Sequence, residues 1–215
     1  MGLQNMKIDI ISDTVCPWCF IGKRRLERAL AMRPNITAEI TWHPFQLNPE
    51  MPTDGIERQI YLKAKFGSPE RAKDIYRAVD QASVGEKLDL QLDDIKRMPN
   101  SLQSHRLLHY ARRHDKQDVV AENLFQSYFF YGIDIGSIAH LIKIAAESSL
   151  DGEDVRSYME SSEDIELVRG HDLQSRKLGV SGVPCFIIAE EYAISGAQES
   201  EVFLQVFDAA KELSC

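Results

Sequence analysis

The order of the secondary-structure patterns predicts an α/β fold with a four-stranded mixed sheet, helices on both of its faces and a large all-helical insertion. Two strand patterns near the N-terminus flank one helical pattern, and two more strand patterns lie between helical patterns near the C-terminus. Between these groups, about 110 residues carry helical patterns, which is enough for a subdomain. We therefore expect a discontinuous sheet domain of residues 1–50 and 165–215, with residues 51–164 inserted as a helical subdomain.

The N-terminal group predicts a βαβ unit. Residues 7–12 contain a short, β-branched apolar run and are expected to form the first strand. A helix is expected over residues 20–32, because Pro34 ends the helical pattern. In residues 37–43 apolar and polar side chains alternate, which indicates a strand with one buried face. The two strands should be parallel, with a right-handed crossover.

The insertion begins where three prolines, at positions 44, 49 and 52, break the strand pattern. Ser68 and Pro69 indicate the start of a helix. Further helices are expected over residues 100–114, 119–131 and 137–148. Aromatic residues cluster near the end of the second of these three. We interpret them as packed core, and the alternative is that some face a substrate.

The C-terminal group predicts a helix, a hairpin and a last helix. The first helix is expected over residues 165–178, because Gly179 is a favoured residue at a helix C-terminus. Residues 185–188 and 192–196 should pair as an antiparallel hairpin. The last helix should span residues 200–213, which carry an apolar stripe at helical spacing.

The segment Cys16-Pro17-Trp18-Cys19 points to redox chemistry. Because Pro17 suits the first helical position, Cys16 should lie at the helix N-terminus, where free N–H groups and the helix dipole favour an anion. In such a position the pKa of a cysteine can fall from about 8.5 to roughly 3.5–7.5. Cys16 is the expected nucleophile, although Asp13 would oppose its ionisation if it lay close. Cys19, one turn later and more buried, is expected to resolve the mixed disulfide.

Other interpretations of the two cysteines are a zinc site and chance structural thiols. A structural zinc needs four ligands, usually with a second close pair. Cys185 and Cys215 form no such pair, and the six histidines are scattered, so no metal is expected. His105 and His109 share a helix face and are interpreted as ordinary polar positions. Four basic residues follow the motif on the same helix, Lys23, Arg24, Arg25 and Arg28, and most of them are interpreted as solvated surface.

Composition and charge narrow the function classes further. A formal net charge of −8 argues against a nucleic-acid or anionic-membrane partner. Residues 1–6 show no secretory signal pattern, and no apolar run approaches about 18 residues. Four cysteines in 215 residues do not indicate a disulfide-stapled secreted scaffold. We expect a cytoplasmic protein whose CxxC motif is catalytic or redox-sensing.

Several segments together resemble one known family. Beside the CxxC motif and Gly182-Val183-Pro184, the matching segments are residues 42–49, 100–107 and 195–198, together with Phe129, Gly132, Asp134 and Ile135. In these segments the chain resembles the thioredoxin fold in its DsbA-like form, and more narrowly the FrnE-like branch of that family. The likeness runs over nearly the whole chain, in the order of the family's motifs.

The resemblance implies a thiol–disulfide oxidoreductase with Cys16 and Cys19 as catalytic residues. It also implies that Val183–Pro184 is a cis peptide bond beside the motif, and that the Val183 backbone pairs with an extended peptide. Pro17, Trp18, Val183 and Pro184 are the expected substrate-binding residues. The expected partners are protein or peptide thiols and disulfides. No cofactor beyond the dithiol is expected, and glutathione stays open as a co-substrate.

Two other functions stay open. Glutathione-dependent isomerases and transferases, of the 2-hydroxychromene-2-carboxylate isomerase and kappa-class types, resemble this architecture but usually place Ser where Cys16 stands. A non-catalytic binding module with a redox-switched thiol pair is the second alternative. Cys185 departs from the family pattern after the proline. We interpret it as a small buried hydrophobe, with a third exchanging thiol as the alternative. Cys215 is interpreted as a mobile surface thiol.

Overall fold

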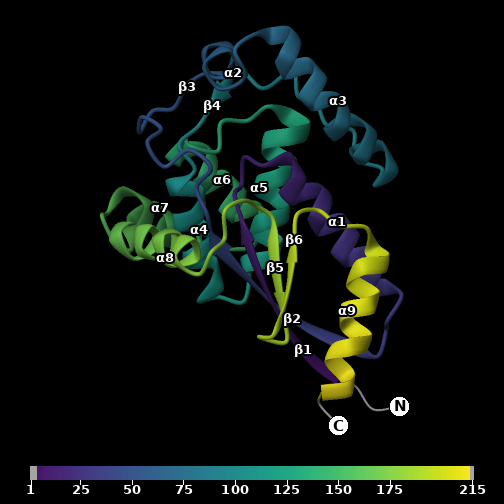
Figure 1. Cartoon of the computed structure of the whole chain (residues 1–215). Coiled ribbons are helices and arrows are strands. Elements are labelled where there is room, and N and C mark those ends of the chain that lie inside the picture. The colour runs from purple at the N-terminus through teal and green to yellow at the C-terminus, as the bar shows by residue number, and fades with distance from the viewer. Residues whose placement is uncertain (1–3, 214–215) are drawn as a thin grey trace.

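A four-stranded sheet forms the centre of the computed structural model, which describes residues 4–213 (Figure 1). The strands are β1 (Gln4–Ser12), β2 (Ile36–Pro44), β5 (Cys185–Ile188) and β6 (Tyr192–Ser195), in the order β2-β1-β5-β6. β1 pairs in parallel with β2 and antiparallel with β5, and β5 pairs antiparallel with β6. The predicted mixed sheet is therefore confirmed, and so is the C-terminal hairpin.

Helices cover both faces of the sheet. On one side, α1 (Pro17–Ala31) packs against α9 (Ser200–Leu213); on the other, α8 (Ile165–Lys177) packs against β2 (Figure 1). The alternation of side chains along β5 separates the two faces: Phe186 packs in the same cluster as α1 and α9, whereas Cys185 belongs to a small cluster with Ile11 and Phe45.

The inserted segment contains all six remaining helices of the described residues. They are α2 (Arg58–Phe66), α3 (Pro69–Gly85), α4 (Leu102–Arg112), α5 (Gln117–Tyr131), α6 (Ile138–Glu147) and α7 (Gly152–Glu160). As predicted, Ser68 caps α3: its hydroxyl accepts a hydrogen bond from the N–H of Arg71. The insertion also contains a two-stranded sheet, β3 (Ile56–Glu57) and β4 (Arg97–Met98), so the expectation of helix alone was wrong there.

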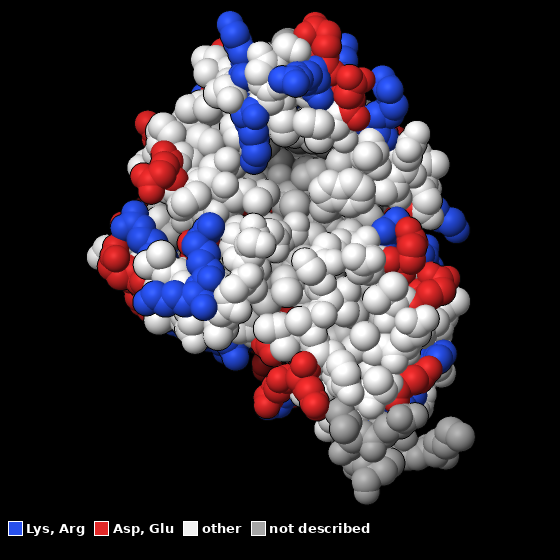
Figure 2. All heavy atoms as spheres, in the orientation of Figure 1, with Lys and Arg blue, Asp and Glu red and all other residues white. Residues whose placement is uncertain are grey.

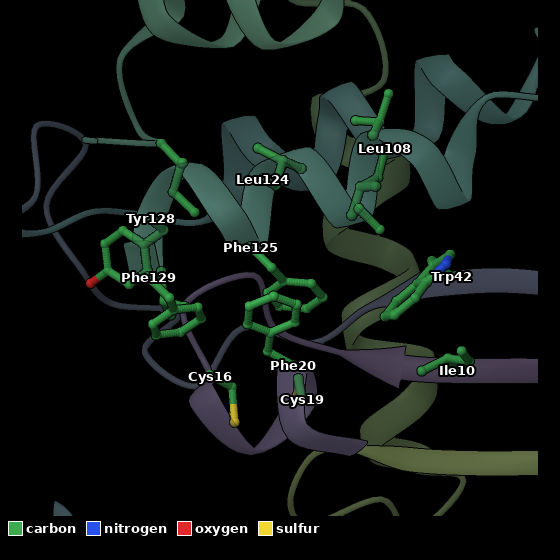
Figure 3. Packing of buried hydrophobic residues seen from close by; sticks show 14 of the residues in the cluster. Ile10, Cys16, Cys19, Phe20, Trp42, Leu108, Leu124, Phe125, Tyr128 and Phe129 are labelled. Atoms are coloured by element: carbon green, nitrogen blue, oxygen red, sulfur yellow. The ribbon is translucent and has the colours of Figure 1, made fainter. Parts of the chain in front are cut away.

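The core passes without a break from the sheet domain into the inserted helices. Phe20 of α1 stacks on Phe125 of α5 with ring centroids 5.1 Å apart, and Trp42 of β2 meets Phe125 edge-on at 5.9 Å (Figure 3). Phe129 completes this aromatic contact, 6.1 Å from Phe20. Most of the predicted aromatic cluster is thus core, although Tyr131 is 70% exposed. The division into residues 1–50 plus 165–215 and residues 51–164 stays a prediction.

The basic residues of α1 differ from expectation. Lys23 and Arg25 are buried, so their interpretation as solvated surface was wrong. Lys23 is paired with Glu122 of α5 at 2.9 Å, and Arg25 with Glu86 at 3.0 Å. These ion pairs join α1 to elements distant in sequence. Within residues 4–213, no helix combines the length and the apolar character that crossing a membrane requires.

Candidate active site around the CxxC motif

Cys16 and Cys19 lie on the first turn of α1. Cys16 is the N-cap residue, with an extended backbone (φ −96°, ψ 113°), and Pro17 follows at the first helical position, as predicted. The Cys16 carbonyl accepts hydrogen bonds from the N–H groups of Cys19 (3.0 Å) and Phe20 (3.4 Å). The first turn contains no acidic side chain. The Cys16 side chain makes no hydrogen bond to the N–H groups of that turn, so Cys16 lies at the positive end of α1 without capping it through its sulfur.

Both sulfurs are thiols in a largely buried setting. Cys19 is 1% exposed, and Cys16 is itself only 4% exposed, so the two differ less in burial than the sequence suggested. Burial raises the pKa of the Cys19 thiol well above its usual value, and the hydrogen bond and charge of Cys16 act in the same direction. The Ser12 hydroxyl and the Asp13 backbone lower that pKa, but less strongly. Cys19 is thus a neutral thiol in the reduced protein.

The Val183–Pro184 loop lies directly beside the first cysteine. The peptide bond between these residues is cis, as the resemblance implied. The Cys16 thiol donates to the Val183 carbonyl at a sulfur–oxygen distance of 3.7 Å, although 167 positions separate the two residues. Pro184 is buried, and its carbonyl accepts a hydrogen bond from the N–H of Gly196 at 2.8 Å.

Gly22 allows α1 to approach this loop closely. A Cβ atom at position 22 would lie 3.0 Å from the Pro184 ring and 3.0 Å from the Phe186 ring. Ordinary carbon–carbon contacts are about 3.5–4.0 Å, so no other side chain fits without displacing these rings. The glycine therefore fixes how near the proline loop sits to the helix that carries both cysteines.

The first turn of α4 holds the loop that precedes the motif. The Thr14 and Ser104 hydroxyl oxygens are 2.6 Å apart, and because Ser104 donates to the Ser101 carbonyl, Thr14 is the donor between them. The fully buried Asp13 accepts from the N–H of Leu47 at 2.7 Å, and its carboxylate lies 3.4 Å from Nε2 of His105. The segment around Asp13 is thus anchored from two sides.

Sequence reasoning named Asp13 only as a nearby charge and missed its contact with His105. His105 is 3% exposed, so its interpretation as an ordinary polar position was wrong. One signal was available: His105 lies three residues after Leu102 and three before Leu108, which places it on an apolar helix face. Its Nε2 has no hydrogen-bond partner among residues 4–213.

The other cysteines are not brought to this site. Cys185 lies across the sheet from α1, in the cluster with Ile11 and Phe45, and burial raises the pKa of its thiol. Cys215 falls outside the described residues. Within the described part of the chain, no three His, Cys, Asp or Glu side chains are grouped so that they could hold a metal ion.

The surface around the motif is largely uncharged. Trp18 and Val183 are both half-buried and pack on the core. On the face seen in Figure 2, uncharged residues cover the middle, where α1 begins, while charged side chains lie around the margin. A groove of about 470 Å³ runs along Leu47, Met51 and Tyr61. Leu47 and Val183 pack on the same small cluster, which places this groove close to the proline loop.

Comparisons with known proteins agree with this geometry. The family model of the DSBA-like thioredoxin domain matches residues 7–208. The uncharacterized protein YwbO of Bacillus subtilis (strain 168) is 27% identical over 209 residues, which cover 93% of this chain and 94% of that protein. The crystal structure of a probable DsbA oxidoreductase from Streptomyces coelicolor is 29% identical, with a TM-score of 0.87 over 96% of this chain and 90% of that one. A 2-hydroxychromene-2-carboxylate isomerase shares the fold at 14% identity, with a TM-score of 0.65 over 97% and 96% of the two chains.

Proposed function

Because the chain belongs to the DSBA-like thioredoxin domain family, we propose that it is a thiol–disulfide oxidoreductase that uses Cys16 and Cys19 on protein or peptide substrates. One observation carries the proposal: Cys16 is the N-cap residue of α1, its sulfur lies 3.7 Å from the Val183 carbonyl oxygen, and a second thiol lies one turn away. A helix N-terminus stabilises the thiolate, and an adjacent thiol can displace a bound substrate. The narrower assignment to the FrnE-like branch is part of the same proposal.

The reaction is a pair of thiol–disulfide exchanges. The Cys16 thiolate attacks one sulfur of a substrate disulfide, forms a mixed disulfide and releases the other substrate sulfur as a thiolate. The Cys19 thiolate then attacks the Cys16 sulfur, so the Cys16–Cys19 disulfide forms and the second substrate thiol leaves. Two electrons pass from the protein to the substrate. The same steps run in reverse oxidise a substrate dithiol, and the reduction potential sets the direction.

Substrate recognition follows from the surface around the motif. We assign Trp18, with Pro17, and the Val183–Pro184 loop to the binding of the substrate segment that carries the sulfur. The groove along Leu47 and Met51 would take apolar side chains of that segment. Since the middle of this face is uncharged, apolar and main-chain contacts should dominate recognition over charge (Figure 2).

Three cysteine variants test the assignment of roles. Cys16→Ser should lose disulfide exchange with a model peptide, whereas Cys19→Ser should accumulate mixed disulfides that mass spectrometry identifies. Cys185→Ser is the matched control, because it removes a buried thiol on the other face of the sheet, and it should keep full exchange activity. Retained turnover in Cys16→Ser would refute the proposed nucleophile.

Titration with reduced and oxidised glutathione separates the oxidoreductase from its alternatives. A reversible two-electron couple that requires both cysteines supports the proposal. Turnover that needs glutathione but survives Cys19→Ser would instead indicate an isomerase or transferase, whose fold is also similar to this one. A thiol pair that does not cycle would indicate a binding module.

A further inference from the structure

Arg58 differs from the other buried cations of the protein. Among residues 4–213, four cationic residues are at most 9% exposed; they are Lys23, Arg25, Arg58 and Arg106. Lys23 and Arg25 are paired with carboxylates, and Arg106 donates to several main-chain carbonyls. For Arg58, which is 6% exposed, no carboxylate of the described residues lies within 4 Å.

The contacts of Arg58 leave its charge without a counter-ion. Its guanidinium carbon lies 5.4 Å from the ring centroid of Tyr76, and it also interacts with the hydroxyl of that residue. An arginine cannot deprotonate in a protein, so it must remain charged in this interior position. A buried and unpaired charge is costly unless an opposite charge reaches it. Arg58 is therefore placed to receive an anion from outside the chain.

A cavity gives such an anion access to Arg58. It has a volume of about 550 Å³ and lies between α2, α3 and the segment 88–95. Arg58 shares its inner wall with buried apolar residues, among them Leu62, Leu88 and Ile95. This volume is in the range of small-molecule sites, which are mostly apolar with a few polar groups that fix the ligand.

The outer wall of the cavity carries both signs of charge. Lys73 and Arg77 are exposed there, but so are Asp80, Asp89 and Asp93. Because this rim has one acidic side chain more than basic ones, it does not itself attract an anion. Selection for an anion must then come from Arg58 at the inner wall.

We propose that this cavity binds a small amphipathic anion, whose carboxylate or phosphate group pairs with Arg58 while its apolar body packs on Leu62, Leu88 and Ile95. The planar guanidinium fork matches both acid groups. None of the residues of the proposed redox site lines this cavity, so the binding site is separate from that chemistry.

Calorimetry on the full-length reduced protein tests the proposal with three probes that share an eight-carbon chain. Octanoate and octyl phosphate carry an acid group, and octanol does not. At least one of the two anions should bind about tenfold more tightly than octanol, and the tighter one identifies the preferred acid group. Equal affinity for all three probes, or binding by none at millimolar concentration, would overturn the proposal.

Variants then assign the preference to Arg58. Arg58→Gln should reduce the affinity of the preferred anion to that of octanol and leave octanol binding unchanged. Arg71→Gln is the matched control, because Arg71 is an exposed arginine of α3 that does not line the cavity. An unchanged preference in Arg58→Gln would refute the site. If that variant does not fold, the Arg58 side-chain resonance of the wild type should shift with the anion and not with octanol, and no shift would refute the site equally.

Discussion

Replacing Gly22 by alanine tests whether the close approach of α1 to the proline loop is needed. The added methyl group would lie 3.0 Å from the Pro184 ring and 3.0 Å from the Phe186 ring. Phe186 is 0% exposed and Pro184 is buried, so neither ring can move into solvent. Either the rings or the helix must shift, and the loop beside Cys16 shifts with them.

The size of the effect follows from two opposing contributions. Replacing glycine by alanine inside a helix raises the free energy of unfolding by about 1 kcal/mol. Forcing a methyl group into a packed core costs about 1–3 kcal/mol. Gly170 supplies the control, because it lies inside α8, is exposed, and a methyl group added there would meet no neighbouring atom within 4 Å. Gly170→Ala should therefore stabilise the protein. The difference in the free energy of unfolding between Gly170→Ala and Gly22→Ala gives the packing cost at position 22, which should be about 1–3 kcal/mol.

Urea unfolding of the two reduced variants, followed by far-UV circular dichroism, measures this difference. Gly22→Ala should have a lower free energy of unfolding than Gly170→Ala, and its exchange rate with a disulfide peptide should fall while that of Gly170→Ala does not. If Gly22→Ala gained as much stability as Gly170→Ala and exchanged at the wild-type rate, the close approach would have no structural or chemical role.

Three further predictions concern the cysteines and one buried arginine. The thiolate is the attacking form and burial raises the pKa of Cys19, so the rate of the resolving step should rise about tenfold per pH unit below that pKa. Stopped-flow measurement of glutathione release from a Cys16–glutathione mixed disulfide gives this rate. A rate that does not change with pH would contradict the role assigned to Cys19. Oxidised Cys16→Ser should contain no Cys19–Cys185 disulfide by peptide mapping, since the sheet separates these thiols; finding that bond would establish a third exchanging thiol. Arg106→Met should lower the free energy of unfolding by about 3 kcal/mol or more, because the carbonyls of the 158–163 segment lose their buried donor. As a control, Arg156→Met replaces an exposed arginine and should change the free energy of unfolding by less than about 0.5 kcal/mol. Equal losses in chemical denaturation would show that Arg106 contributes no more than a surface residue.

Much of the fold could be predicted from local patterns. The bounds of β5 and α9 agree with expectation to the residue, because each carries a short and unambiguous apolar pattern. The two-residue strands β3 and β4 could not be found in this way, since two residues have no period. Their pairing depends on segments about 40 residues apart meeting in the folded chain.

The site was predicted less completely than the fold. The positions of Cys16 and Pro17 followed from capping rules, which depend only on neighbouring residues. The burial of Arg25 could not be predicted from neighbouring residues, because its partner Glu86 lies 61 positions away in the sequence. The segments that carry the family resemblance nevertheless meet around the motif: residues 100–107 supply the Ser104 contact to Thr14, and Gly196 holds the Pro184 carbonyl.

The pairing of β1 with β5 has a consequence for synthesis on the ribosome. β1 ends at Ser12, but its second neighbour begins only at Cys185, so most of the polypeptide must emerge before that edge is covered. Until then, a nascent chain presents an open strand edge next to two cysteines that lack their later neighbours. Such edges invite mispairing, and contacts between remote positions form slowly. Completion of the proposed redox centre should therefore be among the last events of maturation.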